Sequence, residues 1–222
     1  MAIDAMYKEI VRECPLFTGI EDRELEQLLG CLGVKYVSYQ KDEFIFRTDE
    51  KALFVGVVLS GAANVIQEDY WGNRVILGHV SPGELFGEAF SCAESNKLQV
   101  SAVATEPSVI MQINYRRILT VCPASCVFHT RLITNMLKVL ANKNIMLTRK
   151  IEHISRRSTK EKLLSFLSDQ ALLENSSEIV IPYNRQELAD FLCVERSALS
   201  RELGEMKREG LLDYEKNRFV LL

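Results

Sequence analysis

The sequence predicts an α+β protein made of an antiparallel β-barrel or sandwich, one long helix and a C-terminal helix–turn–helix unit that ends in a β-hairpin. Three observations support this prediction. Short β-rich segments follow one another at regular spacing between residues 34 and 113. Residues 124–153 contain no glycine or proline and show helical periodicity. Residues 178–222 contain two short helical segments joined by a tight turn.

A capped helix is expected over residues 21–31, ahead of the β-rich region. The polar segment from Thr18 to Asp22 precedes Leu25, Leu28 and Leu29, which share one helical face. This is the pattern of a helix start followed by an amphipathic helix.

Turn signals divide the β-rich region into seven predicted strands. Ser60-Gly61 and Gly72-Asn73 are typical of hairpins, and Ser81-Pro82-Gly83 marks a further turn. The predicted strands are Val34–Tyr39, Phe44–Arg47, Leu53–Leu59, Ala62–Gln67, Arg74–Val80, Gln99–Ala104 and Val109–Ile113.

The long helix is predicted to begin at Cys122-Pro123, because proline is pre-organised for the first helical turn, and to run to about His153. Two apolar rows follow it. The first has the alternating spacing of four and three residues that defines a heptad seam, and it consists of Cys126, Thr130, Ile133, Leu137, Leu140, Asn144, Leu147, Ile151 and Ile154. The second consists of Leu132, Met136, Val139 and Met146.

These two rows predict a homodimer. A helix of this length spans ~45 Å, more than one small barrel can cover, so we expect the second row to pack on the barrel and the first on another copy of the chain. The predicted interface consists of Ile133, Leu137, Leu140, Asn144, Leu147 and Ile151. Asn144 is a polar seam residue of the kind that fixes register. The alternative is a long helix buried inside a monomer.

Basic residues concentrate after this helix, and the domain boundary is placed near residue 155. The basic stretch consists of Arg149, Lys150, Arg156, Arg157, Lys160 and Lys162, against Glu152 and Glu161. A further helix is expected to begin near Ser158, with leucines 163, 164 and 167 facing inward.

The C-terminal segment has helix–turn–helix spacing followed by a wing. A short strand, Glu178–Ile181, precedes a helix over residues 185–192 with Asn184 as its N-cap, and a second helix runs from Arg196 to about Glu209. Leu211–Tyr214 and Arg218–Leu222 form the wing hairpin. The inward-facing residues are Leu188, Ala189, Leu192, Val194, Leu199, Leu203 and Met206.

This packing leaves Arg196, Ser197, Ser200 and Arg201 on the outer face at the start of the second helix. A recognition helix presents side chains to the major groove from this position, where arginine can bond guanine and serine can bond a base or a phosphate. The alternative is an unspecific helical hairpin with a solvated charged face.

The chain resembles the Crp/Fnr family of bacterial transcription regulators over nearly its whole length. The resemblance rests on motifs in a fixed order: Pro82-Gly83-Glu84-Leu85-Phe86-Gly87-Glu88, the long heptad helix, Ser158-Thr159-Lys160-Glu161-Lys162-Leu163-Leu164, Asn184–Asp190 and Arg196–Arg201. It implies a cupin-like β-roll that senses an effector over residues 1–121, a dimerisation helix over 122–154 and a winged helix–turn–helix over 155–222. It also places Arg196, Ser197 and Arg201 at base-contacting positions, with Ser200 beside them, and Arg185 and Gln186 near phosphate contacts.

The same resemblance bears on the effector. Family members that bind cyclic nucleotides carry an Arg-Ser pair about eleven residues after the Gly87-Glu88 equivalent, and Leu98 and Gln99 stand there in this chain. Glu88, the position to which the resemblance assigns a contact with the ribose hydroxyl, is present in this chain. Leucine cannot neutralise a buried phosphate, so cyclic AMP is not expected and the effector stays unknown.

Other sensing chemistries were compared with the sequence in the same way. Cys14 and Cys31 are too far apart for the N-terminal cysteine cluster of iron–sulfur members, and Ala89-Phe90-Ser91 occupies the position of the haem-ligating histidine of carbon-monoxide sensors. Cys122, Cys126 and His129 share a helical face, which is a possible metal, haem or redox site. Packing of buried thiols at the helix start is the favoured alternative.

Net charge is −3: residues 1–146 carry 14 basic and 17 acidic side chains, and residues 147–222 carry 13 of each. Without the basic excess usual for DNA-binding domains, affinity is expected to depend on dimerisation and a few placed residues. Salt sensitivity is expected to come from the basic stretch and Arg185.

The expected partners are double-stranded DNA with a palindromic operator, a second copy of the chain, and a small-molecule or redox effector. RNA polymerase is a further candidate. No signal peptide, membrane span or CxxC pair is apparent, so a cytoplasmic protein without a membrane partner is expected.

Two other classes of protein fit the sequence less well than a DNA-binding regulator does. A cupin metalloenzyme needs clustered histidines, and residues 34–113 contain only His79. If the chain were a ligand-binding regulatory subunit of another enzyme, Arg196 and Arg201 would have no evident role. An enzyme is therefore not expected.

Overall fold

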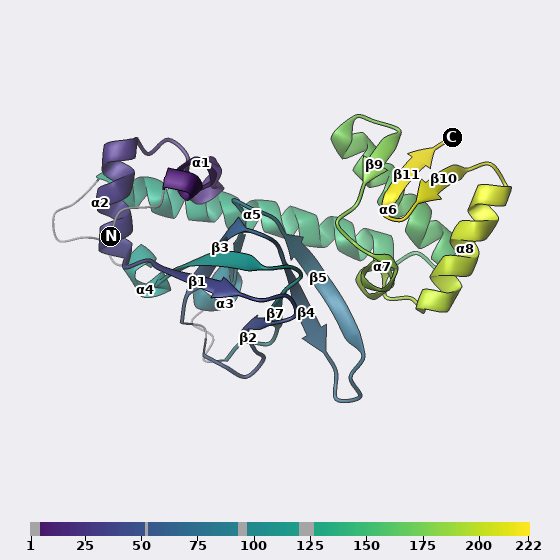
Figure 1. Ribbon diagram of the computed structural model, residues 1–222, viewed down its shortest axis with the longest axis horizontal. Coiled ribbons are helices and arrows are strands. Elements are labelled where there is room, and N and C mark those ends of the chain that lie inside the picture. The colour runs from purple at the N-terminus through teal and green to yellow at the C-terminus, as the bar shows by residue number, and fades with distance from the viewer. Residues whose placement is uncertain (1–4, 52, 93–96, 120–126) are drawn as a thin grey trace. The chain divides into compact units, whose positions relative to one another are not determined.

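The computed structural model describes residues 5–51, 53–92, 97–119 and 127–222 (Figure 1). Contacts divide the chain into two compact units. One is Met1–Asp69 with Leu77–Lys143, and the other is Tyr70–Ile76 with Asn144–Leu222. We call them the N-terminal unit and the C-terminal unit. The division falls inside the long helix, and each unit is described by itself.

The N-terminal unit combines short helices with a β-roll. Its helices are η1 (Ala5–Tyr7), α1 (Lys8–Glu13), η2 (Pro15–Phe17), α2 (Asp22–Leu32), α3 (Glu88–Cys92) and α4 (Tyr115–Leu119). Its strands are β1 (Lys35–Tyr39), β2 (Phe44–Phe46), β3 (Val55–Ser60), β4 (Ala63–Glu68), β5 (Arg74–Val80, shared with the C-terminal unit), β6 (Leu85–Phe86), β7 (Ser101–Ala104) and β8 (Ser108–Ile113).

Helix α2 shows how local sequence sets its limits. Glu21 and Glu24 form a reciprocal capping box at its start, and Gly33 ends it in the left-handed conformation, with φ of 61°. The helix predicted over residues 21–31 is confirmed with a shift of one residue.

The strands form two four-stranded sheets with the orders β1-β8-β3-β6 and β2-β7-β4-β5. Strand β8 pairs antiparallel with both β1 and β3, and β7 pairs antiparallel with β4 and β2. The seven predicted strands are confirmed, with ends shifted by up to two residues. The largest shifts are at β3, where Leu53 lies outside the strand and is 64% exposed, and at β7, which begins at Ser101 rather than Gln99.

One core fills the space between the two sheets. It includes Phe46 and Ile45 from β2, Val58 from β3, Phe86 from β6 and Ile110 from β8. A second core covers the other face of β3, because Val55, Val57 and Leu59 pack with residues of the N-terminal helices. Strand β3 is therefore buried on both faces, which explains its uninterrupted apolar sequence.

Helices α1 and α4 and strand β6 were not predicted. They contain six, five and two residues, and segments of this length show too little periodicity to identify.

Helix α5 (Val127–Ile154) is shared by both units. Leu132, Met136 and Val139 are buried in the second core, as predicted. The prediction for Met146 is wrong: this side chain is 58% exposed, because the N-terminal unit ends at Lys143 and its core does not reach the next turn of the helix. The described helix ends one residue beyond the predicted His153, and the predicted start at Cys122-Pro123 lies outside the described residues.

The C-terminal unit contains α6 (Thr159–Glu174), β9 (Glu178–Val180), α7 (Arg185–Leu192), α8 (Arg196–Arg208), β10 (Leu212–Glu215) and β11 (Arg218–Leu221). The three strands form a sheet with the order β10-β11-β9, in which Glu215 pairs with Arg218 across the predicted hairpin. Inside the unit, the rings of Tyr183 and Phe191 stack at 4.9 Å. Among the described residues, we find no helix that is both long and apolar enough to span a membrane.

Gly56 is a packing constraint that tests this fold. It pairs with Phe86 across β3 and β6, and a Cβ atom added there would lie 2.4 Å from the Phe86 ring. Gly56→Ala is therefore expected to lower the free energy of unfolding by about 1–3 kcal/mol through overpacking, measured by urea denaturation.

The matched control is Gly78→Ala in β5, where an added Cβ meets nothing within 4 Å. Equal stability of the two variants would show that Gly56 and Phe86 do not pack as described.

Candidate nucleic-acid interface

The first helix of the helix–turn–helix is fixed by its own cap. The Asn184 side-chain oxygen accepts hydrogen bonds from the N–H groups of Gln186 at 2.9 Å and Glu187 at 3.1 Å. The Glu187 carboxylate in turn accepts the Asn184 N–H at 2.8 Å. The predicted N-cap is thus confirmed as a capping box, which satisfies donors that a helix start otherwise leaves free.

The turn and the second helix are held by burial. Leu188, Ala189 and Leu192 of α7 are fully buried, as are the docking residues Leu199, Leu203 and Met206 of α8. Cys193 ends α7 in the left-handed conformation, with φ of 53°. The predicted inner face is confirmed except at Val194, which is half-buried, and it fixes which side of α8 turns outward.

The outward side carries the four residues predicted for base recognition. Arg196, Ser197, Ser200 and Arg201 are all exposed and lie in the first two turns of α8. Arginine and serine are side chains that can donate to base edges and phosphates. The structure therefore presents these four residues together on one accessible face.

The two residues predicted for phosphate contact differ from each other. Gln186 is exposed and donates to Asp190 at 2.8 Å. The Arg185 guanidinium instead lies 4.7 Å from the ring centroid of Tyr214 and 5.1 Å from that of Phe219. Its Nη1 is buried without a hydrogen-bond partner, and burial lowers the pKa of this guanidinium. Arg185 thus connects α7 to the wing, a contact with residues about thirty positions away that sequence spacing does not reveal.

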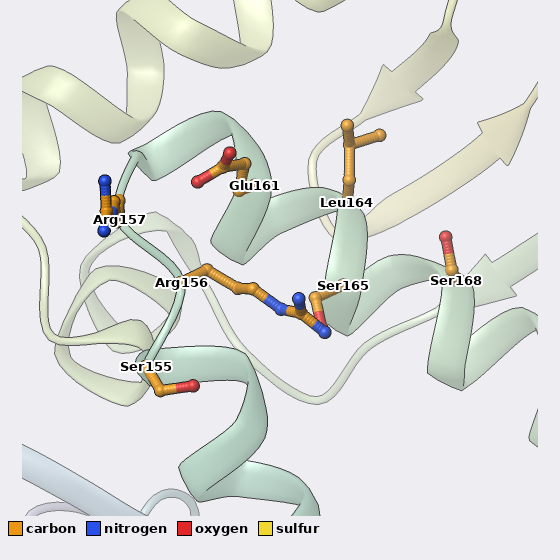
Figure 2. A pocket seen from close by; sticks show the side chains of 7 residues that line it. All are labelled: Ser155, Arg156, Arg157, Glu161, Leu164, Ser165 and Ser168. Carbon is orange, nitrogen blue, oxygen red and sulfur yellow. The ribbon is translucent and has the colours of Figure 1, made fainter.

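The linker between α5 and α6 forms an open hollow of about 570 Å³ (Figure 2). Arg156 extends toward Ser165 in this view and bonds Glu152 at 3.0 Å, whereas Arg157 extends to the other side. Ser158 caps α6 and accepts the Glu161 N–H at 3.2 Å. Within the described part of the chain, no ion pair involves Arg157, so it is the cation here most available to a phosphate.

Most of the other cations in the basic stretch are already engaged. Lys160 pairs with Glu209, and Lys162 donates to the carbonyl oxygens of Leu192 and Cys193 at the turn of the helix–turn–helix. Arg149 lies 4.0 Å from Asp169. The stretch is therefore less available to DNA than its sequence indicates.

Lys150 corrects the prediction for this stretch most clearly, because it is only 6% exposed. Its ammonium donates to the Ile76 carbonyl oxygen and lies 4.4 Å from the centre of the Phe191 ring. Burial lowers the pKa of Lys150 to about 8. Lys150 is therefore a structural cation, and the salt sensitivity predicted for the basic stretch does not come from this residue.

The predicted effector residues separate into a buried pair and an exposed residue. Glu88 is 3% exposed and Leu98 is 3% exposed, whereas Gln99 is exposed. Gly87 precedes α3 with φ of 80°. Leu98 packs in the core between the sheets, so the position where the family implies a phosphate-binding cation is an apolar core residue here.

Glu88 already has a cation from the chain itself. One carboxylate oxygen lies 2.9 Å from the Lys143 ammonium, which also donates to the Leu85 carbonyl oxygen. The other oxygen is buried without a hydrogen-bond partner. Lys143 was not among the predicted site residues, although its spacing of four residues from Val139 continues the buried row of α5 and could have identified it.

The suggested metal or redox site is not tested by this structure. Cys122 and Cys126 lie outside the described residues, and so does the side chain of His129. The hypothesis that they bind a metal or sense redox state stays a prediction.

Comparisons with known proteins agree with this geometry. A family model of the cyclic nucleotide-binding domain matches residues 36–125, and one of the Crp-like helix-turn-helix domain matches residues 161–222. The transcriptional activatory protein AadR of Rhodopseudomonas palustris is 28% identical over 190 residues, which cover 80% of this chain and 73% of that protein. The transcriptional activator protein FnrL of Cereibacter sphaeroides is 25% identical over 89% of this chain and 80% of its own length.

Solved structures show the same fold. FixK2 from Bradyrhizobium japonicum matches with a TM-score of 0.67 and 21% identity over 85% of this chain and 92% of its own. CLP of Xanthomonas campestris, described as a c-di-GMP responsive global regulator, matches with a TM-score of 0.73 and 21% identity over 88% of this chain and 98% of its own.

Lys150 gives this region a testable pH dependence. Its pKa is about 8 in the folded protein and 10.5 in its ordinary state, so below pH 8 both states are protonated and the full cost of the buried charge is present. Between pH 8 and 10.5 the unfolded chain binds more protons, so the contribution of Lys150 to folding stability rises with pH, by at most about 3 kcal/mol.

The measurement is urea denaturation between pH 7 and 10.5 for the wild type, Lys150→Met and the exposed Lys41→Met. We expect folding stability to rise between pH 8 and 10.5 in the wild type and in Lys41→Met, but not in Lys150→Met. A rise of the same size in all three proteins would mean that Lys150 titrates as an ordinary lysine.

Proposed function

The chain belongs to the Crp/Fnr family of DNA-binding transcription regulators, which are not enzymes, and from this premise we propose that it acts as a homodimer on a palindromic operator under the control of a signal sensed in the β-roll. The β-roll over residues 1–121 senses the effector, residues 122–154 form the dimerisation helix, and residues 155–222 form the winged DNA-binding domain. RNA polymerase is a further partner of the proposed complex, and the site of action is the cytoplasm.

The exposed face of α8 is the single observation that supports sequence-specific DNA binding most strongly. The apolar side of this helix, formed by Leu199, Leu203 and Met206, is fully buried inside the unit. The opposite side is therefore free to enter a DNA groove. Arg196 and Arg201 provide the donors for guanine and phosphate. Ser197 and Ser200 lie beside them, and Gln186 at the start of α7 and Arg185 against the wing are proposed to contact the backbone.

The exposed row of α5 supports the homodimer. Leu137, Leu147 and Ile151 are 63%, 51% and 62% exposed, and Asn144 on the same row is also exposed. Ile133 and Leu140 are half-buried beside them. Large aliphatic side chains at heptad spacing lose this exposure when two helices pack.

The ion pair between the buried Glu88 and Lys143, together with the apolar Leu98, supports an effector other than cyclic AMP. A cyclic phosphate at Leu98 would meet no cation, and burying an unpaired charge costs several kcal/mol. The Glu88 carboxylate, for its part, is neutralised by Lys143 at 2.9 Å. The effector is proposed to be a different small molecule or a redox signal.

DNA recognition is tested by substituting the exposed arginines of α8. A duplex selected by the wild type from a random library serves as the probe, and affinity is measured by fluorescence anisotropy at fixed salt. Arg196→Ala and Arg201→Ala are each expected to weaken binding by about 10- to 100-fold, the effect of losing a bidentate base contact. Cyclic AMP is expected to leave the affinity unchanged.

The control is Arg208→Ala at the far end of the same helix, where the side chain is 76% exposed. Selection that enriches no sequence, or loss of affinity that is equal for Arg196→Ala and Arg208→Ala, would contradict the proposed recognition face.

The dimer is tested by placing a charge in the exposed row of α5. The wild type is expected to sediment as two chains of 25.3 kDa each, and Leu137→Asp is expected to raise the dimer dissociation constant at least about tenfold, since a buried unpaired carboxylate is costly. Analytical ultracentrifugation measures both.

Leu172→Asp is the matched control, because Leu172 is 80% exposed on α6 and lies outside the proposed interface. A monomeric wild type, or a Leu137→Asp variant that dimerises as well as this control, would rule out α5 as the interface.

A further inference from the structure

The N-terminal unit contains a cavity of about 720 Å³ away from Glu88 and Leu98. Its lining comes from the end of α2, the start of β1, the β8–α4 junction and the residues Lys51, Leu53 and Phe54 ahead of β3. Four cations line it, Lys35, Lys51, Arg116 and Arg117, together with the amides Gln112 and Asn114. Its size falls within the usual range of small-ligand pockets, about 300–1,000 Å³.

None of the described residues that line the cavity carries a carboxylate. This concentration of positive charge is unexpected from composition, because residues 1–146 carry 17 acidic and only 14 basic side chains. Two other lysines of the unit have acidic partners: Lys97 lies 3.2 Å from Asp49, and Lys8 lies 3.4 Å from Glu26. Several cations around one hollow give it a positive potential that attracts an anion.

The strands fix the positions from which the polar residues start, and the four cations themselves are exposed. Lys35 is opposite Gln112 in the register of β1 and β8, and the Gln112 side chain donates to the Tyr39 hydroxyl at 2.8 Å. The Asn114 side chain accepts the Arg116 backbone N–H at 3.0 Å. The start of β1 and the end of β8 thus place polar residues at the same end of the sheet.

Arg117 is the most constrained of the four cations. Its Nη1 donates to the Cys31 carbonyl oxygen at 3.1 Å. A Cβ atom on Gly33 would lie 2.5 Å from the same nitrogen, so the guanidinium lies directly over Gly33. One of its N–H groups is used in this contact, and a guanidinium has five, which suit phosphate and carboxylate oxygens.

We propose that this cavity binds a small anion with two or more negative charges, either a phosphate ester or a polycarboxylate. The inference goes beyond the proposed function and does not depend on DNA binding, because every residue involved lies in the N-terminal unit. It gives the sensor unit an anion site separate from the Gly87–Leu98 region that the family resemblance points to.

The test is isothermal titration calorimetry on the full chain, with pyrophosphate as the phosphate probe and citrate as the carboxylate probe. Binding of one anion per chain is expected for at least one of the two probes. The probe that gives a binding isotherm shows whether the cavity takes a phosphate or a polycarboxylate. Lys35→Gln combined with Lys51→Gln is expected to weaken this binding at least tenfold. Arg116→Gln is a second, independent variant with the same expected direction.

Lys41→Gln is the control, since Lys41 is an exposed lysine outside the cavity, and thermal unfolding confirms that each variant folds. Heat from neither anion at millimolar concentration overturns the proposal, as does equal binding by the double variant and the control. Binding of hexaglutamate but of neither small anion, lost in the double variant, also overturns it and identifies an acidic protein surface as the partner instead.

Discussion

Burial of a single row of side chains along α5 is the constraint on which the rest of the structure depends. Leu132, Met136 and Val139 complete the second core of the N-terminal unit, and a helix can turn only one such row inward. The rotation that buries this row leaves Leu137, Leu147 and Ile151 in solvent. The same rotation directs Lys143 at Glu88, so the exposed apolar row and the neutralisation of the buried carboxylate have one cause.

The helix–turn–helix obeys a similar rule on a smaller scale. The caps and the left-handed Cys193 determine how α7 ends, and the apolar side of α8 determines how it docks. The polar side chains at the start of α8 face outward because the apolar side of the helix is used in this packing. Arg185 shows the limit of the rule, because its guanidinium is taken up by the rings of the wing rather than left in solvent.

Local patterns made most of the architecture predictable. Alternating strands, turn signals and the Asn184 cap depend on neighbouring residues, and each was found close to its expected position. The exposed face of α8 also followed from periodicity. Long-range contacts were not predictable: Lys150 reaches a carbonyl 74 residues away, and Lys143 reaches one 58 residues away. A lysine in an apolar row at a spacing of three or four residues is the signal that could have identified both.

Two lysines, the half-buried Lys143 and the buried Lys150, also fix α5 along its own axis. Apolar side chains can exchange partners when a helix slips by one turn, about 5.4 Å, because their contacts have no preferred direction. Lys143 and Lys150 are seven residues apart, and each ends on one carbonyl oxygen, of Leu85 and Ile76 respectively. A one-turn slip would move both lysines away from these acceptors, and for Lys150, which is 6% exposed, it would leave a buried ammonium group without its acceptor at a cost of about 1–3 kcal/mol. These polar bonds therefore favour one register of the helix, in addition to the burial of its apolar row.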